Sequence, residues 1–346
     1  TRVALAAMWE LKAPTLIVVP TLELMDQWER AVSRFFQVPI GRFGGGSKEV
    51  RCVTVATYDS AYINAEVLGN KFLLVVFDEV HHLPSPGYRQ IAELNAAPFR
   101  LGLTATPERE DEGHLLLPEL VGPIVYRKKV GELKGRYLAD FDVVVVRVKL
   151  SEEERERYLK LVKEYKSYLE ERGIRLRSPR DFEKLVKMTG LDRRAREALL
   201  AWREARRIAF NARAKLEKLR EILEKHRGDR VLIFTENTEM VREISRRLLI
   251  PEITYKTPER ERREVLKAFR EGRVSAVVTS RVLEEGVDVP EANVAVVISG
   301  TGSRREFVQR LGRILRPRPG KRAVLYELVT SGTKEVGVAR RRKRGL

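Results

Sequence analysis

Cysteine, histidine and long hydrophobic runs are scarce in this sequence of 346 residues. A single cysteine, Cys52, excludes a disulfide within the chain and any zinc site that needs several cysteines. The four histidines include the neighbours His81 and His82, but no carboxylate stands at the helical spacing of a metal-binding pair, so we expect no zinc site. No apolar run reaches the ~18 residues of a membrane-spanning helix. The sequence therefore predicts a cytoplasmic protein without a membrane partner.

Acidic residues are outnumbered, with 49 aspartates and glutamates against 67 lysines and arginines. The net charge of +18 and the isoelectric point near 10.0 predict a polyanionic partner, and nucleic acid is the first choice. A basic protein of ribosomal type and a membrane-surface protein are the alternatives. Five of the charges lie in ARRRKRGL (339–346), which we expect to be a disordered arm. The charged fraction of 34% exceeds the usual value of about a quarter, which indicates a thermophile.

The length and the hydrophobic pattern predict two α/β domains with a helical insert between them. In residues 1–147, short runs rich in β-branched residues alternate with helical spacing, which indicates parallel strands separated by helices. The strands expected there are 15–19, 52–57, 72–77 and 100–105, with a closing or bridging strand at 141–150. A helix is expected in ELMDQWERAVSRFF (23–36).

Residues 148–207 have the pattern of a charged helical insert without strand signals. Ser151 is followed three residues later by Glu154, which predicts a capping box at the start of its first helix. A long helix at about 208–226 opens the second α/β domain, residues 208–330, and residues 331–346 are the basic tail. The strands expected in this domain are 230–237, 274–280, 294–299 and 323–329.

The strongest local signal is FLLVVFDEVHHL (72–83), in which a buried strand ends at two acids. Ligands bind at the carboxyl ends of strands in open α/β sheets, so Asp78 and Glu79 are expected to face a ligand. One carboxylate can hold Mg²⁺ through water while the other deprotonates an attacking water, the chemistry of phosphoryl transfer. The alternative is that both acids are ordinary turn residues.

About 25 residues further on, RLGLTATPERED (100–111) places Thr104 and Thr106 at the end of the next strand. Their hydroxyls are expected to bond to groups on the acid-bearing segment.

The second domain carries the cations. In REFVQRLGRILRP (305–317), Arg310, Arg313 and Arg316 recur every three residues and share one side of a helix. Three cations on one face repel unless an anion lies opposite, and a nucleotide triphosphate is such an anion. A solvated basic face is the alternative. Upstream, VVTSRVLEEGVDVPEANVAVVIS (277–299) offers Gly286 for phosphate contact and Asp288 for a ribose hydroxyl.

These segments together resemble the superfamily 2 helicases and translocases, which have two RecA-like domains. In the order Ia, Ib, II, III, IV, V and VI, the matching motifs are VVPTLELMDQW, VATYDSA, DEVH, TAT, VLIFTEN, VVTSRVLEEGVDVP and QRLGRILR. Within the superfamily, DEVHHLPSPGYRQIA and LGLTATPERED are most similar to the XPB-type branch, including its archaeal members. The insert stands where that branch has its thumb-like insert.

The resemblance implies an ATP-dependent DNA helicase or translocase of 3′–5′ polarity, acting in DNA repair or transcription-related DNA opening. ATP would bind between the two domains with Mg²⁺ held by Asp78 and the hydroxyl of Thr1, and Glu79 would activate water. The further residues that the family assigns to the nucleotide are Arg313, Arg316, Gln309, His81, Gly286 and Asp288. Thr104 and Thr106 would couple the nucleotide state to movement.

The resemblance also implies contacts to DNA. The candidate backbone contacts are Pro20, Thr21, Thr57 and Thr279. Arg109, Glu110 and Asp111 match the RED element of the XPB type and would act at the junction of duplex and single strand. Archaeal relatives can work with a nuclease, so such a partner is expected.

The resemblance aligns Thr1, the first residue of the sequence, with the last position of the phosphate loop, GxxxxGK[ST]. No such motif occurs elsewhere in the sequence. Its amides and lysine hold the phosphates in this superfamily, so we expect impaired ATP hydrolysis by residues 1–346 alone. Three alternatives stay open: a non-catalytic nucleic-acid-binding remnant, a restriction- or nuclease-associated translocase, and an RNA helicase.

Overall fold

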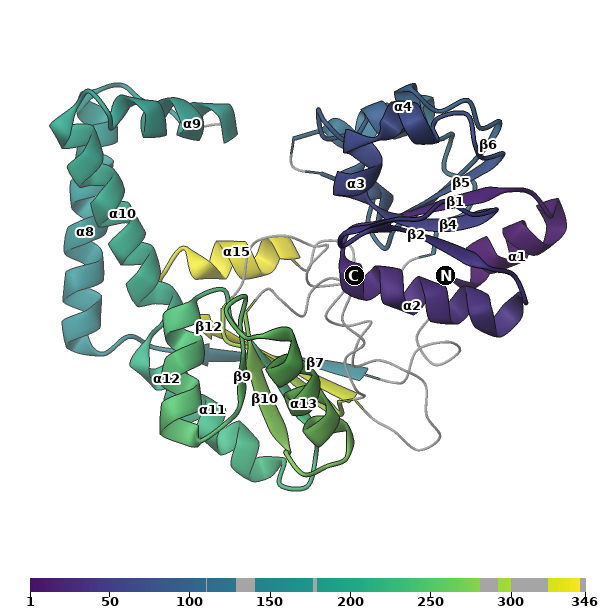
Figure 1. Ribbon diagram of the computed structural model, residues 1–346. Helices are drawn as coiled ribbons and strands as arrows, with labels where there is room; N and C mark the ends of the chain where they lie inside the picture. The colour runs from purple at the N-terminus through teal and green to yellow at the C-terminus, as the bar shows by residue number, and fades with distance from the viewer. Residues whose placement is uncertain (110, 129–140, 177–178, 281–291, 300–322, 343–346) are drawn as a thin grey trace. The chain divides into compact units, whose positions relative to one another are not determined.

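A computed structural model describes residues 1–346 except 110, 129–140, 177–178, 281–291, 300–322 and 343–346. The described residues form two compact units, residues 1–128 and residues 141–342 (Figure 1). Each contains one sheet of six strands, so the prediction of two parallel-sheet α/β domains is confirmed. None of the helices in the described ranges is both long enough and apolar enough to cross a bilayer.

The sheet of the first unit has the order β3-β2-β4-β1-β5-β6. All neighbours are parallel except β3, which pairs antiparallel with β2. The strands are β1 (Thr15–Val19), β2 (Ile40–Gly44), β3 (Ser47–Lys48), β4 (Val53–Thr57), β5 (Leu74–Asp78) and β6 (Phe99–Leu103). The sequence patterns predict β1, β4, β5 and β6 but give no signal for β2 and β3, because IGRFG is short, polar and rich in glycine.

Helices cover both faces of this sheet, which explains why every residue of β1 and β4 is buried. Leu16 and Val18 point into one core cluster, whereas Ile17 and Val19 point into the other, as the two-residue period of a strand requires. Figure 1 shows α1 (Arg2–Leu11) and α2 (Leu22–Phe35) on one face and α3 (Tyr58–Ile63) and α4 (Ala65–Leu68) on the other. The shorter helices are α5 (Gln90–Glu93) and α6 (Leu117–Leu120), with 3₁₀ turns at Val80–His82 and Gly113–Leu116.

The second sheet is entirely parallel, in the order β7-β12-β11-β8-β10-β9. Its strands are β7 (Phe141–Val148), β8 (Val231–Phe234), β9 (Glu252–Ile253), β10 (Ala276–Thr279), β11 (Val294–Val297) and β12 (Ala323–Thr330). The helices around it are α11 (Arg213–Lys225), α12 (Thr238–Leu248), α13 (Glu259–Arg270) and α15 (Glu335–Arg342). The two-residue strand β9 had no sequence signal.

The insert consists of α8 (Glu152–Glu171), α9 (Pro179–Met188) and α10 (Arg193–Phe210). Helices α8 and α10 pack along each other, with α9 across their far end (Figure 1). The predicted capping box is present: Ser151 Oγ accepts from the Glu154 amide, and the Glu154 carboxylate accepts from the Ser151 amide. Tyr165, Tyr168 and Leu185 form the core of the insert with small residues of α10.

Two expected boundaries differ from the structure. The strand at 141–150 was assigned to a first domain of residues 1–147, but β7 pairs with β12 along its whole length, from Phe141 opposite Ala323 to Val148 opposite Thr330. The insert therefore interrupts the second unit after its first strand in the chain, instead of separating two domains, and its last helix runs to Phe210 rather than 207. Pairing between residues 182 positions apart depends on tertiary structure and leaves no local signal.

The basic tail expected at 331–346 is also corrected. Residues 335–342 form α15, and Thr333, Glu335 and Ala339 are buried against the second unit. The arm expected to be disordered from 339 is helical as far as 342, because apolar Ala339 and the buried carboxylate of Glu335 give the helix an inward face.

Candidate active site

The candidate site is built where β5 ends, in the first unit. The Asp78 carboxylate accepts two hydrogen bonds, one from the Trp28 indole Nε1 at 2.7 Å and one from the Glu79 amide at 3.1 Å. The Tyr58 hydroxyl donates to the Asp78 carbonyl at 3.1 Å. Burial raises the pKa of Tyr58 well above its usual value, and the charges of Asp78 and Glu79 add to the effect. These donors fix both the backbone and the carboxylate of Asp78.

Glu79 leaves the strand in the left-handed region, with φ 48° and ψ 52°. This conformation costs a residue other than glycine about 1 kcal/mol or more, and such residues gather at functional sites. The Glu79 Oε2 lies 3.4 Å from His81 Nδ1 and 3.5 Å from Thr104 Oγ1. Its side chain is 23% exposed, so the carboxylate can still reach a ligand.

Thr104 joins the end of β6 to the acid-bearing segment. Its hydroxyl lies 3.1 Å from Nδ1 of the buried His81, and the Thr106 amide donates to the same hydroxyl at 3.3 Å. The register of β5 and β6 places Asp78 opposite Leu103, so Thr104 follows directly. The expected contact between a strand-end hydroxyl and the acid motif is therefore present for Thr104. Thr106 is 4% exposed and contributes through its backbone.

Arg109 connects the same site to the loop that follows. Its Nη1 donates to the His81 carbonyl at 2.6 Å, while Nε and Nη2 donate to the Asp111 carboxylate at 2.8 and 2.6 Å. The hydrogen bonds from Arg109 hold the pKa of Asp111 below its usual value. The Arg109 side chain is 19% exposed and braces the 3₁₀ turn at Val80–His82. Glu110 lies outside the described residues, and a role of this element at a DNA junction stays a prediction.

The candidate DNA contacts of the first unit lie at two neighbouring strand ends. Val19 of β1 is opposite Thr57 of β4, so the segment Pro20–Thr21 and Thr57 are adjacent. Thr21 is the N-cap of α2 and accepts from the Leu24 amide at 3.2 Å. Thr57 is 8% exposed, and its hydroxyl bonds to Ser60. Contact of these residues with DNA remains a prediction.

Comparison with known proteins bears on both units. Residues 207–346 match the family described as the ERCC3/RAD25/XPB C-terminal helicase, and residues 1–109 match the res subunit of type III restriction enzymes. The chain is 50% identical over 343 residues to a protein of Sulfurisphaera tokodaii named DNA 3′-5′ translocase XPB2, covering 99% of this chain and 78% of that protein.

This chain belongs to the XPB family of superfamily 2 helicases.

A more distant XPB-family protein, the DNA 3′-5′ helicase XPB of Mycobacterium tuberculosis, is 33% identical over 362 residues, covering all of this chain and 58% of that protein. Among solved structures, the helicase domain of Pyrococcus furiosus Hef superposes with a TM-score of 0.60 at 20% identity, covering 98% of this chain and 91% of that one. This likeness shows the shared fold.

The residues of the site can be compared with what a nucleotide-bound Mg²⁺ requires. The described residues contain no cluster of three histidine, cysteine, aspartate or glutamate side chains suited to a metal. Mg²⁺ bound to nucleotides needs only one or two carboxylates, because waters and phosphate oxygens complete its shell. The partly exposed carboxylate of Asp78 fits that requirement. Thr1 is exposed, and its side chain makes no capping bond to α1, so its hydroxyl is not used by the helix.

Most predicted residues of the second unit fall in undescribed segments. Gly286, Asp288, Gln309, Arg313 and Arg316 lie outside the described residues, and their roles stay predictions. Thr279 ends β10, where it is fully buried and its hydroxyl donates to the Ser280 carbonyl at 2.9 Å. In this conformation the Thr279 hydroxyl serves the backbone.

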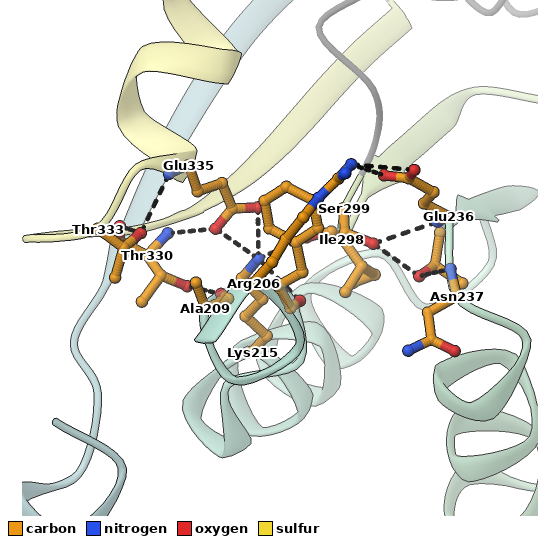
Figure 2. Close-up of polar contacts among 12 residues, drawn as sticks. Arg206, Ala209, Lys215, Glu236, Asn237, Ile298, Ser299, Thr330, Thr333 and Glu335 are labelled. Atoms are coloured by element: carbon orange, nitrogen blue, oxygen red, sulfur yellow. Dashed lines mark hydrogen bonds and ion pairs between the residues drawn. The ribbon is translucent and has the colours of Figure 1, made fainter. Parts of the chain in front are cut away.

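Two groups of polar residues in the structure were not predicted from the sequence. One is Trp28 and Tyr58 around Asp78. The other is a buried ion pair in the second unit: the Lys215 ammonium contacts both carboxylate oxygens of Glu335 at 2.7 and 2.8 Å and donates to the carbonyls of Ile298 and Phe210 (Figure 2). Lys215 lies on the buried face of α11, and a lysine at an apolar position of a helix is the sequence feature that could have indicated a buried ion pair.

The ion pair adjoins a second set of bonds just beyond β11. Ser299 Oγ lies 2.9 Å from Thr235 Oγ1 and accepts from the Glu236 amide, while the Glu236 carboxylate accepts from Arg206 of α10 (Figure 2). Motif IV, the insert and the end of β11 are therefore joined before the chain continues into residues 300–322.

Proposed function

We propose that this chain is the motor of a DNA 3′–5′ translocase or helicase, using the energy of ATP hydrolysis to move along DNA. The observation that carries the proposal is the constellation at the end of β5, where Asp78, Glu79, His81 and Thr104 meet in a polar cluster. The names of the relatives support DNA as the substrate, and the net charge of +18 supports a polyanionic partner.

The residues divide the chemistry between them. Asp78 is the carboxylate that would hold Mg²⁺, with water between, and Thr1 is the second candidate for this ion. Bound Mg²⁺ would neutralise charge on the phosphate oxygens of ATP. Glu79 accepts the proton of the attacking water at its carboxylate. Thr104 and His81 orient that carboxylate, and Thr104 links it to β6.

The further nucleotide-binding residues of the proposal lie outside the described ranges. Arg313 and Arg316 would stabilise the γ-phosphate charge, Gln309 with His81 would link motifs II and VI, and Gly286 and Asp288 would contact the nucleotide. We place the protein in the cytoplasm of a thermophilic archaeon, acting on DNA junctions during repair or transcription-related opening. A nuclease partner belongs to the same proposal.

Phosphate release measured with and without duplex DNA tests the proposal. Because GxxxxGK[ST] is absent from the sequence, the assay compares residues 1–346 with the same residues preceded by such a loop. We expect low hydrolysis by the first protein and DNA-stimulated hydrolysis by the second. Glu79→Gln should lower that rate by about 10²–10⁴ while leaving ATP binding intact, because the amide cannot accept the proton.

Two outcomes count against the proposal. Hydrolysis at the parent rate by the Glu79→Gln variant would exclude Glu79 as the base. Stimulation by RNA but not by DNA would make the protein an RNA motor. Glu49→Gln is the matched control, because this exposed carboxylate pairs with Arg51, away from the residues of the site.

A further inference from the structure

Trp28, the last residue of the segment VVPTLELMDQW that resembles motif Ia, makes a polar contact to the acid of motif II. It is 1% exposed, and its indole Nε1 donates to Asp78 Oδ2 at 2.7 Å, across 50 residues of sequence. A hydrogen bond of this length to a carboxylate belongs to the strong, charge-assisted class. The ring also packs into the core beneath β1 with Met25 and Val32, so the indole cannot turn away without disrupting that core.

The geometry of the Asp78 carboxylate depends on this donor. Oδ1 accepts from the Glu79 amide and Oδ2 accepts from Trp28, so the two oxygens are held from two different segments of the chain. Each carboxylate oxygen has two lone pairs, and one on each remains for a further donor such as a metal-bound water. The indole therefore orients the carboxylate without blocking it.

The same tryptophan stands on the helix that starts at the predicted DNA contact. Helix α2 begins after Thr21, and Trp28 lies seven residues further, about 10 Å along the axis. Arg42 of β2 holds this helix by its Nη1, which donates to Asp26 at 2.7 Å and to Glu29 at 2.8 Å. Arg42 thus links two turns of the same helix, and we expect the stretch from Thr21 to the indole to respond to DNA as one unit.

We propose that Trp28 is a positioning residue that orients the Asp78 carboxylate for Mg²⁺ and transmits to it a movement of α2 when DNA binds. The inference rests on the proposed function, in which Asp78 holds the metal ion. It adds a direct link between motif Ia and motif II that bypasses Thr104.

The test removes the indole N–H and keeps the ring. Replacing Trp28 by 3-benzothienylalanine, in which sulfur stands in place of the N–H, preserves the shape of the side chain, and Trp28→Phe is the genetically simpler variant. Trp9→Phe is the control, since Trp9 is 60% exposed on α1. In the loop-restored protein, we expect the replacements at 28 to raise the Mg²⁺ concentration for half-maximal hydrolysis several-fold and to lower the stimulation by DNA.

A second readout does not depend on hydrolysis and uses residues 1–346 themselves. Protein labelled with ¹⁵N at tryptophan gives indole N–H signals for Trp9, Trp28 and Trp202. The signal absent from Trp28→Phe should exchange slowly with deuterium and shift in Asp78→Asn, because a neutral acceptor weakens the bond. Mn²⁺ added with ATP to the loop-restored protein should broaden it.

The outcomes separate the two proposals. If Asp78→Asn and Glu79→Gln both hydrolyse ATP at the parent rate, the proposed function fails. If those variants are impaired while the benzothienyl protein keeps its Mg²⁺ dependence and DNA stimulation, only the role of Trp28 fails. An indole signal that does not respond to Asp78→Asn also overturns that role.

Discussion

The two units bury polar side chains in opposite ways. In the first unit, Asp78 and Glu79 are contacted by an indole, a backbone amide, a hydroxyl and an imidazole, and the Glu79 side chain is 23% exposed. In the second unit, the charges of Lys215 and Glu335 neutralise each other at 0% exposure. The first arrangement orients acids while leaving them accessible to a cation. The second holds segments of the second unit together.

The difference shows what each network is for. Orienting a carboxylate with neutral donors keeps its negative charge available, which a metal site requires. The ion pair joins α11 to α15 and to the Ile298 carbonyl, and the Thr330 amide donates to Glu335 at 2.8 Å. Backbone carbonyls and an amide thus form hydrogen bonds with both charges, which offsets the cost of removing a buried ion pair from water.

Breaking the buried ion pair of Lys215 and Glu335 should have the largest effect on stability. Lys215→Met leaves the Glu335 carboxylate buried opposite an apolar chain and should destabilise the second unit by about 3–5 kcal/mol. The double variant Lys215→Met/Glu335→Leu should recover most of that loss. Hydrogen exchange in urea measures this loss of stability on peptides from β8 and β11. Peptides from β1 and β4, in the first unit, are the internal controls. Equal losses in the single and double variants would contradict the argument.

Removing Arg109, which braces the candidate site of the first unit, should have an intermediate effect on stability. Arg109→Ala deletes the charge-assisted bond to the His81 carbonyl, and we expect a loss of about 1.5–3 kcal/mol in the first unit. Asp111→Asn is the matched control, because it weakens a pair whose carboxylate is 59% exposed, keeps an oxygen that can accept from the Gly113 amide, and should cost under ~1 kcal/mol. The same peptides from β1 and β4 report the change. A loss in Asp111→Asn as large as that in Arg109→Ala would show that the His81 contact contributes nothing.

The helix caps that follow β1 in the first unit and β8 in the second unit allow a smaller, matched comparison. Thr21 caps α2, and Asn237 caps α12 by accepting from the Glu239 amide at 2.8 Å. Replacing either by alanine should cost about 1 kcal/mol, because one amide at the helix start loses its acceptor. Only Thr21→Ala should also weaken DNA binding, measured by fluorescence anisotropy, and Thr21→Ser should restore both properties. Unchanged DNA affinity in Thr21→Ala would remove Thr21 from the interface.

The smallest effect is expected in the alkaline range. The hydrogen bond from Tyr88 to Asp59 raises the pKa of the Tyr88 phenol to about 12. The folded state holds this proton more tightly than the unfolded state, whose tyrosine pKa is about 10. The contribution is complete below pH ~10 and is lost as the pH rises through about 12. Tyr88→Phe should flatten the decline in urea midpoint of the first unit over that range, and Tyr165→Phe should act on the second unit alone. A decline in the first unit as steep in Tyr88→Phe as in the parent would refute this.

Prediction from sequence succeeded where a local pattern carries the information. The central strands were found because runs such as TLIVV are apolar throughout, which is typical of a strand covered on both faces. The acid motif was placed correctly at a strand end because the apolar run stops at Asp78. The short strands β2, β3 and β9 were missed because two to five residues with glycine or charge give no periodic signal.

Local patterns along the chain were enough to predict two α/β sheets, the helical insert, the excess of positive charge, and the acids with the hydroxyl that follows on the next strand. These features follow from periodicity, composition and the rule that parallel strands end at one edge. Tertiary structure alone decided that β7 belongs to the second sheet, that α15 folds back, that Trp28 holds Asp78 and that Lys215 meets Glu335 across 120 residues. Each of these contacts joins distant segments, and the free energy that selects it comes from burial and hydrogen bonding in the folded chain.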